Sequence, residues 1–526
     1  MMSEDYPSAL AKIRPHTTSK QAHQRKPAQL LVALESTLDQ TDADATSQHN
    51  PTAYFAALVT TLEGCLSKGD AALEDGDTLP AVLYLLALTI PFVSSTVLRT
   101  NSGRLFQLLS PILPLTAHDY APPLRSMITI FGGVLGSLDQ SSVQSTIALS
   151  NSGASSTSIS IRQTFSTLLE LTLDQRPKVR KRAGEVVKAI LDAPPFPLAV
   201  HPWSILVAEW SCGVVAQSAD AVQAGGKKGA ASGGTERLIH LLAFLRTAPS
   251  IFTAPNEDTR RADEASALET MTRYLLSMPK LSNPYLTQAS YQLLTSFFSV
   301  EDEDEEEDVA ERRRAKAKNV LSTLVQAAPL KNDAQIAPYW LVVVAAACAS
   351  AFSITYKSAT TSKEILDVWN LLWTYLDSSC TSTTHTAAAE ALTLLAKSGC
   401  FSTSELQTGG AGAKAVVELI EKSLSQLAYA ESIQEILDVL TALLVTSSPF
   451  DPKARKVNKA DPVKLHKKME QASPFIPLLA TMVRLRNTKG FEHKEATDQV
   501  LTAFMKTIGV DGVLARIPLG LLPKER

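Results

Sequence analysis

The sequence is poor in cysteine, and neither sign of charge prevails. Its 526 residues include five cysteines, and no two of them form a C-x-x-C pair. An odd number of cysteines without that spacing argues against a disulfide framework or a zinc knuckle, and favours buried free thiols in a reducing compartment. The net charge of −3 excludes a chain that is basic throughout, so any contact with nucleic acid must depend on local patches.

Segments typical of secretion or membrane insertion are missing as well. Residues 1–15 are polar and contain no signal-peptide hydrophobic stretch. The most apolar segment, Tyr339 to Phe352, is shorter than the roughly 18 residues that suggest a membrane span. We therefore expect this segment to form a buried helix in a protein of the cytosol or nucleus that has no membrane partner.

Motifs that carry chemistry are not found either. The sequence has no G-x-x-x-x-G-K-[ST] phosphate loop, no dinucleotide-binding glycine fingerprint and no H-E-x-x-H, and its nine histidines lack metal-ligand spacing. No spacing of Ser, His and Asp marks a catalytic triad. We predict that the chain is not an enzyme, and that it has no catalytic residue, cofactor, metal site or small-molecule substrate.

What the sequence does contain is helical spacing along most of its length. Apolar residues recur at i, i+3, i+4 and i+7 in segments such as Leu366 to Leu376 and Ile433 to Leu444, while strand-like alternation is nearly absent. Prolines such as Pro80 and Pro91 stand at the edges of these segments, where they end one helix or fit the first turn of the next. Because 526 residues exceed what one compact core usually holds, we predict an all-α solenoid of stacked antiparallel helical hairpins, with a compact bundle as the alternative.

Changes in composition divide the chain into four predicted parts. Ser/Thr-rich and Gly-rich stretches indicate loops, and the eight consecutive acids Glu301 to Asp308 indicate a solvated hinge. Alternatively, these acids pair with the arginines at 312–314 at i, i+4 spacing if a helix extends back to them. The predicted parts are an N-terminal leader with one or two helices (1–50), repeats with flexible insertions near 149–160 and 217–235 (51–300), an acidic linker (301–310), and further repeats with a basic loop near 447–468 (311–526).

The sharpest local pattern is a helical hairpin between Thr164 and Leu191. Its two apolar stripes are separated by the turn Asp174-Gln175-Arg176-Pro177, and Pro177 suits the first turn of the second helix. The pattern D-x-x-P-x-V-R, with a helix on each side, resembles the HEAT-repeat signature. The resemblance implies that Asp174 and Arg180 form a structural pair that supports the turn and the neighbouring repeat.

The second helix of this hairpin carries candidate RNA-binding residues. Its cations lie off the apolar stripe, and only Asp174 and Glu185 dilute their charge. A solvated face is the simpler interpretation, since exposed charge is normal on amphipathic helices. The functional interpretation is contact with RNA phosphates, which arginine binds in a bidentate manner. The candidate residues here are Arg176, Lys178, Lys181, Arg182 and Lys188.

A second basic region begins at Lys453. Its spacing resembles a loose bipartite nuclear-localisation signal, which is a weak pattern. The simpler interpretation is a soluble loop followed by an exposed helix, and the alternatives are contact with RNA or with an import receptor. The candidate RNA-binding residues of this region are Lys453, Arg455, Lys456, Lys459, Lys464, Lys467 and Lys468.

Several segments together resemble the ribosomal RNA-processing protein 12 family. They are Leu10 to Leu38, Pro51 to Lys68, Leu79 to Thr100, and the block from Asp174 through the PPFP and HPW motifs to Trp203. The resemblance implies a HEAT/armadillo-like superhelix in the nucleus and nucleolus. Its expected partners are pre-rRNA, pre-ribosomal particles and ribosome-assembly factors, with Ran and export receptors as further candidates. Family members are usually much longer, so we expect this chain to form part of a longer superhelix.

The implied function is that of a non-enzymatic scaffold in small-subunit maturation and pre-ribosome export. A karyopherin-like transport receptor or adaptor is the alternative, because it shares the helical solenoid. The sequence offers no signature for Ran binding or for grooves that accept Phe-Gly peptides. A passive structural spacer is the third hypothesis, and it predicts no specific association with nucleic acid or particles.

Overall fold

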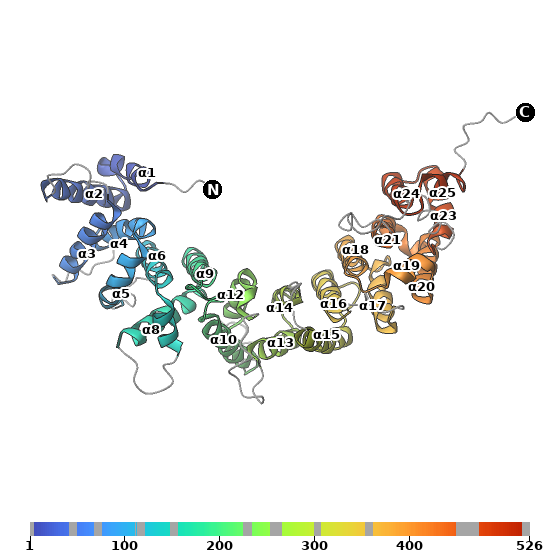
Figure 1. Ribbon diagram of the computed structural model, residues 1–526, viewed down its shortest axis with the longest axis horizontal. Helices are drawn as coiled ribbons and strands as arrows, with labels where there is room; N and C mark the ends of the chain where they lie inside the picture. Colours follow the sequence, from blue (N-terminus) through green and yellow to red (C-terminus); the bar gives the residue numbers. More distant parts are fainter. Residues whose placement is uncertain are drawn as a thin grey trace, which may run out of the picture. The chain divides into compact units, whose positions relative to one another are not determined.

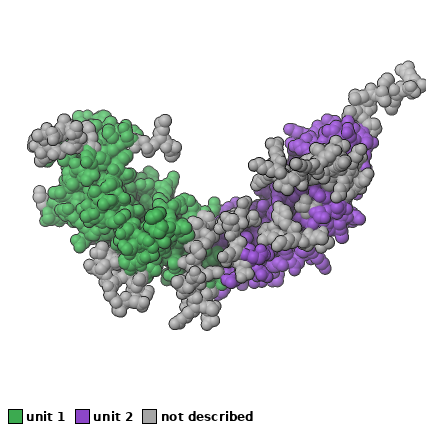
Figure 2. Space-filling view, in the orientation of Figure 1, with its two compact units in different colours: residues 1–271 green, residues 272–526 purple. Residues whose placement is uncertain are grey.

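The computed structural model consists of helices joined by turns and loops. The residues that it describes are 5–41, 50–67, 76–110, 112, 121–147, 156–224, 234–252, 266–298, 307–352, 361–448 and 473–517, and no β-strand occurs within these ranges. The chain divides into two compact units, residues 1–271 and 272–526, which Figure 2 colours separately. The boundary between the units falls within helix α13 (Ala267–Ser277).

The first unit contains two rows of helices (Figure 1). Its helices before α13 are α1 (Tyr6–Ala11), α2 (Ala22–Thr41), α3 (Pro51–Ser67), α4 (Thr78–Thr89), α5 (Ser95–Leu109), α6 (Pro122–Gly136), α7 (Gln140–Ile147), α8 (Ser156–Leu171), α9 (Pro177–Leu191), α10 (Ser204–Ala224) and α12 (Gly234–Thr247), with 3-10 helices η1 (Arg14–Thr18), η2 (Ile90–Phe92) and η5 (Pro249–Phe252). In one row α2, α4, α6 and α9 pack in succession, and in the other α3, α5 and α8 do so. The pairs α3–α4, α5–α6, α8–α9 and α10–α12 pack as hairpins across the rows.

Helix α6 packs closely between α4 and α9 because glycines face both neighbours. A Cβ atom at Gly133 would lie 2.1 Å from Cγ2 of Ile90, the residue that follows α4. A Cβ atom at Gly132 would lie 2.5 Å from Cγ1 of Val186 in α9. Both distances are far shorter than any van der Waals contact, so the spacing of this row requires glycine at the two positions.

The second unit repeats the arrangement in two rows (Figure 1). Its helices after α13 are α14 (Pro284–Phe298), α15 (Glu307–Gln326), α16 (Ala337–Phe352), α17 (Lys363–Trp373), α18 (Ser382–Lys397), α19 (Thr403–Thr408), α20 (Ala411–Ser425), α21 (Ile433–Ser447), α23 (Ile476–Asn487), α24 (Lys494–Ile508) and α25 (Val510–Leu514), with 3-10 helices η7 (Met278–Leu281), η9 (Thr374–Leu376) and η10 (Leu427–Ser432). Helices α14, α16, α18, α21 and α24 pack in succession, and α15–α16, α17–α18, α20–α21 and α23–α24 pack as hairpins. Together, the two units confirm the prediction of an all-α solenoid of stacked hairpins.

Buried tryptophans connect neighbouring elements of the second unit. The indole nitrogen of Trp340 in α16 donates a hydrogen bond to the Leu324 carbonyl of α15 at 2.9 Å. That of Trp373 in α17 donates to Oγ of Ser423 in α20, also at 2.9 Å. Each indole therefore buries a large apolar surface while its one polar atom remains satisfied. Helix α16, which holds the most apolar segment of the sequence, is buried along most of its length.

No helix in the described ranges is long and apolar enough to cross a membrane. The apolar segment Tyr339 to Phe352 lies in α16, which packs against α14, α15 and α18.

Two predicted insertions are partly helical. Helix α8 begins at Ser156, within the insertion predicted near 149–160, and α10 continues to Ala224, within the one predicted near 217–235. The sequence of the α10 extension is rich in alanine, which favours helix, and Ser218 is 5% exposed, so packing also holds this turn. Because these segments are rich in Ser and Gly, their composition predicted loops and did not indicate where the two helices begin or end.

The acidic linker predicted at 301–310 is also partly helical. Helix α15 begins at Glu307, so the helix extends back into the acidic run. Oε1 of Glu307 lies 2.9 Å from Nη2 of Arg314. This ion pair spans seven residues, or two helical turns. Acidic side chains near a helix N-terminus also interact favourably with the helix dipole.

Candidate nucleic-acid interface

The turn between α8 and α9 is stabilised by a bidentate ion pair. Asp174 accepts two hydrogen bonds from the Arg176 guanidinium, from Nε to Oδ1 and from Nη2 to Oδ2, each at 2.9 Å. Oδ1 also accepts the backbone N–H of Arg176 at 2.8 Å. The hydrogen bonds that Arg176 donates to Asp174 raise the pKa of Arg176 above its usual value. Arg176, a sequence candidate for RNA contact, therefore has its charge neutralised within the turn.

Arg180 reaches the same turn through the backbone. Its Nη1 donates to the Asp174 carbonyl oxygen at 2.7 Å and lies 3.4 Å from the carbonyl oxygen of Gln175. The sequence resemblance had paired Arg180 with Asp174, and the structure brings the two residues together at the carbonyl and not at the carboxylate. The carboxylate is occupied by Arg176, which lies nearer along the chain.

The outward face of α9 carries charges of both signs. Lys178, Lys181, Arg182, Glu185, Lys188 and Asp192 each lie three or four residues from another member of the set, which places them on one side of the helix. Four cations and two carboxylates leave an excess of two positive charges. The opposite side of α9 holds the buried apolar residues of the hairpin core, Val179, Ala183, Val186, Val187, Ile190 and Leu191.

The cations of this face differ in how strongly they are engaged. The side chain of Lys181 is 80% exposed and its Nζ lies 4.0 Å from Oε1 of Glu185. Lys178 is exposed and forms no ion pair with a described residue. Lys188 donates to the Thr247 carbonyl oxygen at 2.6 Å, at the end of α12, and its Nζ lies 3.9 Å from Asp192. Lys188 thus joins two helices, whereas Lys178 and Lys181 extend into solvent.

Arg182 connects the face to the preceding helix of the row. Its Nε donates to Oγ1 of Thr129 in α6 at 3.0 Å, and its Nη1 lies 3.4 Å from Oε2 of Glu185. One turn further along both helices, Gly132 abuts Val186. The two contacts advance in the same direction, so α6 and α9 run parallel, and Arg125 of α6 lies at the level of Lys178.

Arg125 adds a cation that the sequence patterns did not single out. It is half-buried near the start of α6, its Nε has no hydrogen-bond partner in the described part of the chain, and no described carboxylate pairs with it. The other residues of α6 are apolar or neutral. In the sequence, only the presence of a single arginine in an apolar helix could have indicated that Arg125 belongs to this site. We refer to Arg125, Lys178, Lys181 and Arg182 as the α6–α9 basic face.

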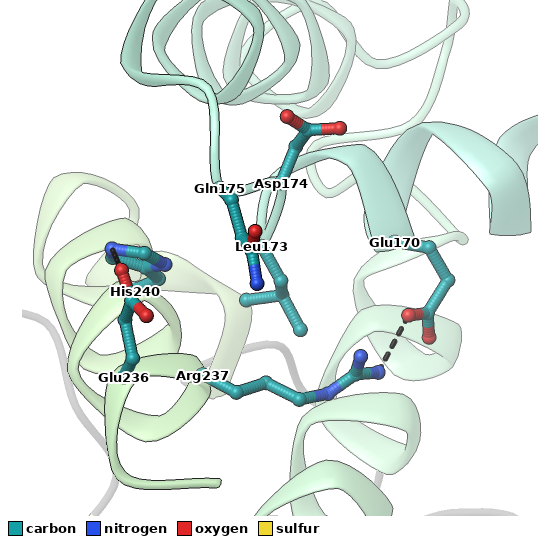
Figure 3. Close-up of a pocket in the computed structure, with 7 residues that line it drawn as sticks. All are labelled: Glu170, Leu173, Asp174, Gln175, Glu236, Arg237 and His240. Carbon is teal, nitrogen blue, oxygen red and sulfur yellow. Dashed lines mark hydrogen bonds and ion pairs between the residues drawn. The ribbon is translucent and has the colours of Figure 1, made fainter. Parts of the chain in front are cut away.

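A polar hollow lies beside the α8–α9 turn (Figure 3). Its volume is about 460 Å³, and it is lined by Glu170, Leu173, Asp174, Gln175, Glu236, Arg237 and His240. Glu170 of α8 connects its walls, because it accepts hydrogen bonds from Arg237 of α12 at 2.5 Å and from the Trp210 indole of α10 at 2.8 Å. These contacts hold consecutive hairpins together. The lining has three carboxylates and one arginine, so it is acidic and does not favour an anionic ligand such as RNA phosphate.

His240 at the edge of this hollow is kept uncharged. Burial lowers the pKa of His240 below its usual value, and the nearby positive charge of Arg180 lowers it further. Glu236, whose Oε1 lies 3.9 Å from Nε2, raises the pKa without reversing the shift. At neutral pH this histidine therefore contributes a hydrogen bond to the Leu173 backbone, and not charge, where α12 meets the α8–α9 turn.

The second basic region, Lys453 to Lys468, lies outside the described residues. Its candidate contacts, Lys453, Arg455, Lys456, Lys459, Lys464, Lys467 and Lys468, remain sequence predictions. Within the described ranges no group of three or more His, Cys, Asp or Glu side chains is arranged to hold a metal ion.

Comparison with known proteins connects this fold to one family. Residues 14–304 match the family described as "RRP12-like, N-terminal HEAT repeats", and residues 378–526 match "Ribosomal RNA-processing protein 12, HEAT repeats". The chain is 24% identical over 447 residues to Ribosomal RNA-processing protein 12 of Saccharomyces cerevisiae (strain ATCC 204508 / S288c), a match of 82% of this chain and 34% of that protein. The chain thus spans about a third of the length of this curated relative.

One solved structure, described as a crystal complex of SYS-1/POP-1, aligns with 95% of this chain and 100% of its own at 10% identity. Its TM-score of 0.26 is too low to support any conclusion. The family matches are of a different quality, because the first alone covers more than half of the chain and both describe HEAT repeats. They confirm the resemblance inferred from the sequence and the HEAT type of the hairpins: the chain belongs to the RRP12-like family of HEAT-repeat proteins.

Proposed function

We propose that the chain is a non-enzymatic scaffold of ribosome biogenesis, which binds pre-rRNA and assembly factors during small-subunit maturation and pre-ribosome nuclear export. The observation that carries this proposal is the match of both halves of the chain to families of ribosomal RNA-processing protein 12 repeats. The same matches favour the scaffold over a karyopherin-like receptor. The corresponding location is the nucleus and nucleolus.

The α6–α9 basic face is the proposed contact with RNA. Lys178 and Lys181 extend into solvent, and Arg182 and Arg125 lie beside them across two packed helices. Cations on a rigid surface release condensed counterions from a phosphate backbone when they bind it. Arg176 and Lys188 are better described as structural, because Asp174 and the Thr247 carbonyl already engage them.

Charge reversal tests this contact. The triple variant Lys178→Glu, Lys181→Glu, Arg182→Glu should bind an in vitro transcribed small-subunit pre-rRNA fragment at least roughly tenfold more weakly at moderate salt, because three phosphate contacts become repulsions. The slope of log affinity against log salt should become shallower by about 2, since each contact with single-stranded RNA contributes about 0.7. Fluorescence anisotropy at several salt concentrations measures both quantities.

A matched variant separates the site from the net charge. Lys397, Lys414 and Lys422 are exposed on α18 and α20, so their replacement by glutamate changes the charge equally at a different surface. This control should retain most of the affinity. Equal losses in the two variants, or no loss in the first, would remove the α6–α9 basic face from the proposal.

Co-sedimentation tests the scaffold function itself. The tagged chain should sediment with pre-40S particles from nucleolar extracts, and reversal of the basic face should weaken this association. Absence from the particles, together with direct binding to GTP-loaded Ran, would favour the transport receptor.

A further inference from the structure

The connection between α9 and α10 displays an aromatic ring that the packing of the repeats does not use. Phe196 is 94% exposed, more than any other large hydrophobic side chain in the described ranges. The neighbouring residues Pro197 and Ala199 are also exposed, and Val200 is 36% exposed. A cluster of this kind leaves apolar surface in water, which is unfavourable unless a partner covers it.

The base of this connection is fixed to the core of the first unit. Trp203 is fully buried, and its indole nitrogen donates to Oγ1 of Thr146 in α7 at 2.8 Å. Its ring centroid lies 4.4 Å from that of Phe165 in α8. The ring of His201 packs against Trp203 at 5.1 Å, and its Nδ1 accepts the backbone N–H of Trp203 at 3.2 Å. Burial lowers the pKa of His201 to about 4, so this contact stays neutral at physiological pH.

The exposed end of the connection is also constrained. The backbone N–H of Leu198 donates to the Pro195 carbonyl at 3.0 Å, which closes a turn around Phe196. Where the loop leaves α9, the backbone N–H of Ala193 donates to the Ile190 carbonyl at 3.2 Å. Three prolines in the eight residues 193–200 further limit the backbone. A ring presented on so restricted a loop loses little conformational entropy on binding.

The charges near the loop indicate the class of partner. Residues 193–200 contain no charged side chain, and the adjacent Asp192 is acidic. The nearest cation along the chain, Lys188, lies 3.9 Å from Asp192 and donates to Thr247. An aromatic residue that stacks on an RNA base normally has cations beside it to hold the phosphates. This loop lacks them, so its chemistry fits an apolar pocket in a protein.

We propose that Phe196 is an anchor that inserts into an apolar pocket of a protein component of the pre-ribosomal particle. The inference rests on the proposed function for the identity of the particle, but it concerns a surface separate from the α6–α9 basic face. Because residues 193–200 carry no charge, we expect the rim of the partner's pocket to be uncharged as well. A single aromatic side chain at the centre of such a contact commonly dominates its binding energy.

Substitution and photocrosslinking together test the anchor. Phe196→Ala in the full chain should weaken association with purified, salt-washed particles by roughly 10- to 100-fold, while Phe196→Leu should retain part of it, because leucine keeps an apolar side chain. Tyr285→Ala is the matched control, since Tyr285 is 67% exposed in the second unit. With p-benzoylphenylalanine at position 196, irradiation of the bound complex should produce a crosslink to one apolar peptide of one particle protein.

The outcomes distinguish this inference from the function on which it rests. Loss of affinity in Phe196→Ala with an unchanged unfolding midpoint, together with a protein crosslink, supports the anchor. Crosslinking to RNA, or unchanged affinity of Phe196→Ala while the wild-type chain binds particles, overturns the anchor alone. Failure of the wild-type chain to bind particles overturns both proposals.

Discussion

Arg176 and Lys178 are two residues apart, yet their side chains have different environments. Asp174 binds the Arg176 guanidinium through two hydrogen bonds, whereas Lys178 is exposed. The sequence located both cations on a basic segment but did not reveal which of them a carboxylate engages. Arg125 was missed for the converse reason, because its proximity to α9 depends on the packing of helices 53 residues apart in sequence. Local spacing predicts a face of one helix, but not what a neighbouring helix adds to it.

Glu405 is a buried carboxylate that holds two helix starts together. It is 4% exposed, and its two oxygens accept the backbone N–H groups of Thr361 and Gly412, each at 2.7 Å. Burial raises the pKa of Glu405, but the hydrogen bonds from Thr361 and Gly412 outweigh burial, so the pKa lies below its usual value. The carboxylate is therefore more stable in its ionised form in the folded chain than in the unfolded chain.

The variant Glu405→Gln should lower the free energy of unfolding of the second unit by about 2 kcal/mol at pH 7, because one charge-assisted hydrogen bond is lost and the other weakened. Since the folded pKa is depressed, the advantage of the wild type is full above the unfolded value near 4.3 and disappears as pH falls through the folded pKa. Urea denaturation at pH 7 and at pH 3 measures the difference. The control Glu418→Gln, at an exposed position of α20, should leave the free energy of unfolding nearly unchanged at both pH values. An equal loss of stability in Glu405→Gln at pH 7 and pH 3 would show that the ionised carboxylate is not what stabilises this site.

At the scale of elements, the periodic pattern predicted which segments are helices better than where they end. The α8–α9 hairpin agrees with its sequence pattern because Pro177 fixes the start of α9 and its apolar stripe is regular. The start of α8, the end of α10 and the start of α15 were harder to predict, because the polar composition of these segments suggested loops. Burial of residues such as Ser218, and the ion pair from Glu307 to Arg314, extend those helices beyond what composition indicates.

The close approach of α4, α6 and α9 leads to a test within one helix. Gly133→Ala should destabilise the chain by on the order of 1–2 kcal/mol, because overpacking against Ile90 costs about 1–3 kcal/mol and the better helix propensity of alanine returns at most about 1 kcal/mol. Gly136 is the control in the same helix, since a Cβ atom there has no neighbour within 4 Å. Gly136→Ala should be neutral or stabilising in thermal unfolding. If Gly133→Ala and Gly136→Ala both left the thermal unfolding midpoint unchanged, α6 would have enough room to shift away from Ile90.

At the scale of the whole molecule, the order of helix contacts follows the order of the sequence. Within each unit, helices of a row pack mainly on the next helix of that row and on their hairpin partner. Stability in such an array is approximately a sum of repeat and neighbour terms, so a local disturbance remains local. This property follows from the repeat architecture, which the helical spacing of the sequence already indicated, whereas the individual neighbour contacts required the structure.

Hydrogen exchange on the full chain tests this locality. Gly133→Ala should raise exchange in α6 and in α4 and α9, which pack on it, and leave α18, α21 and α24 protected as in the wild type, because α6 does not pack on the latter group. Glu405→Gln should have the reverse pattern, with faster exchange around α19 and α20 and no change in α4 to α9. Because each variant serves as the control for the other, a general effect on expression or aggregation cannot produce opposite patterns. Faster exchange throughout the chain in either variant would mean that the helices unfold as one cooperative body, and that the stability of the α6–α9 basic face cannot be altered separately from that of the second unit.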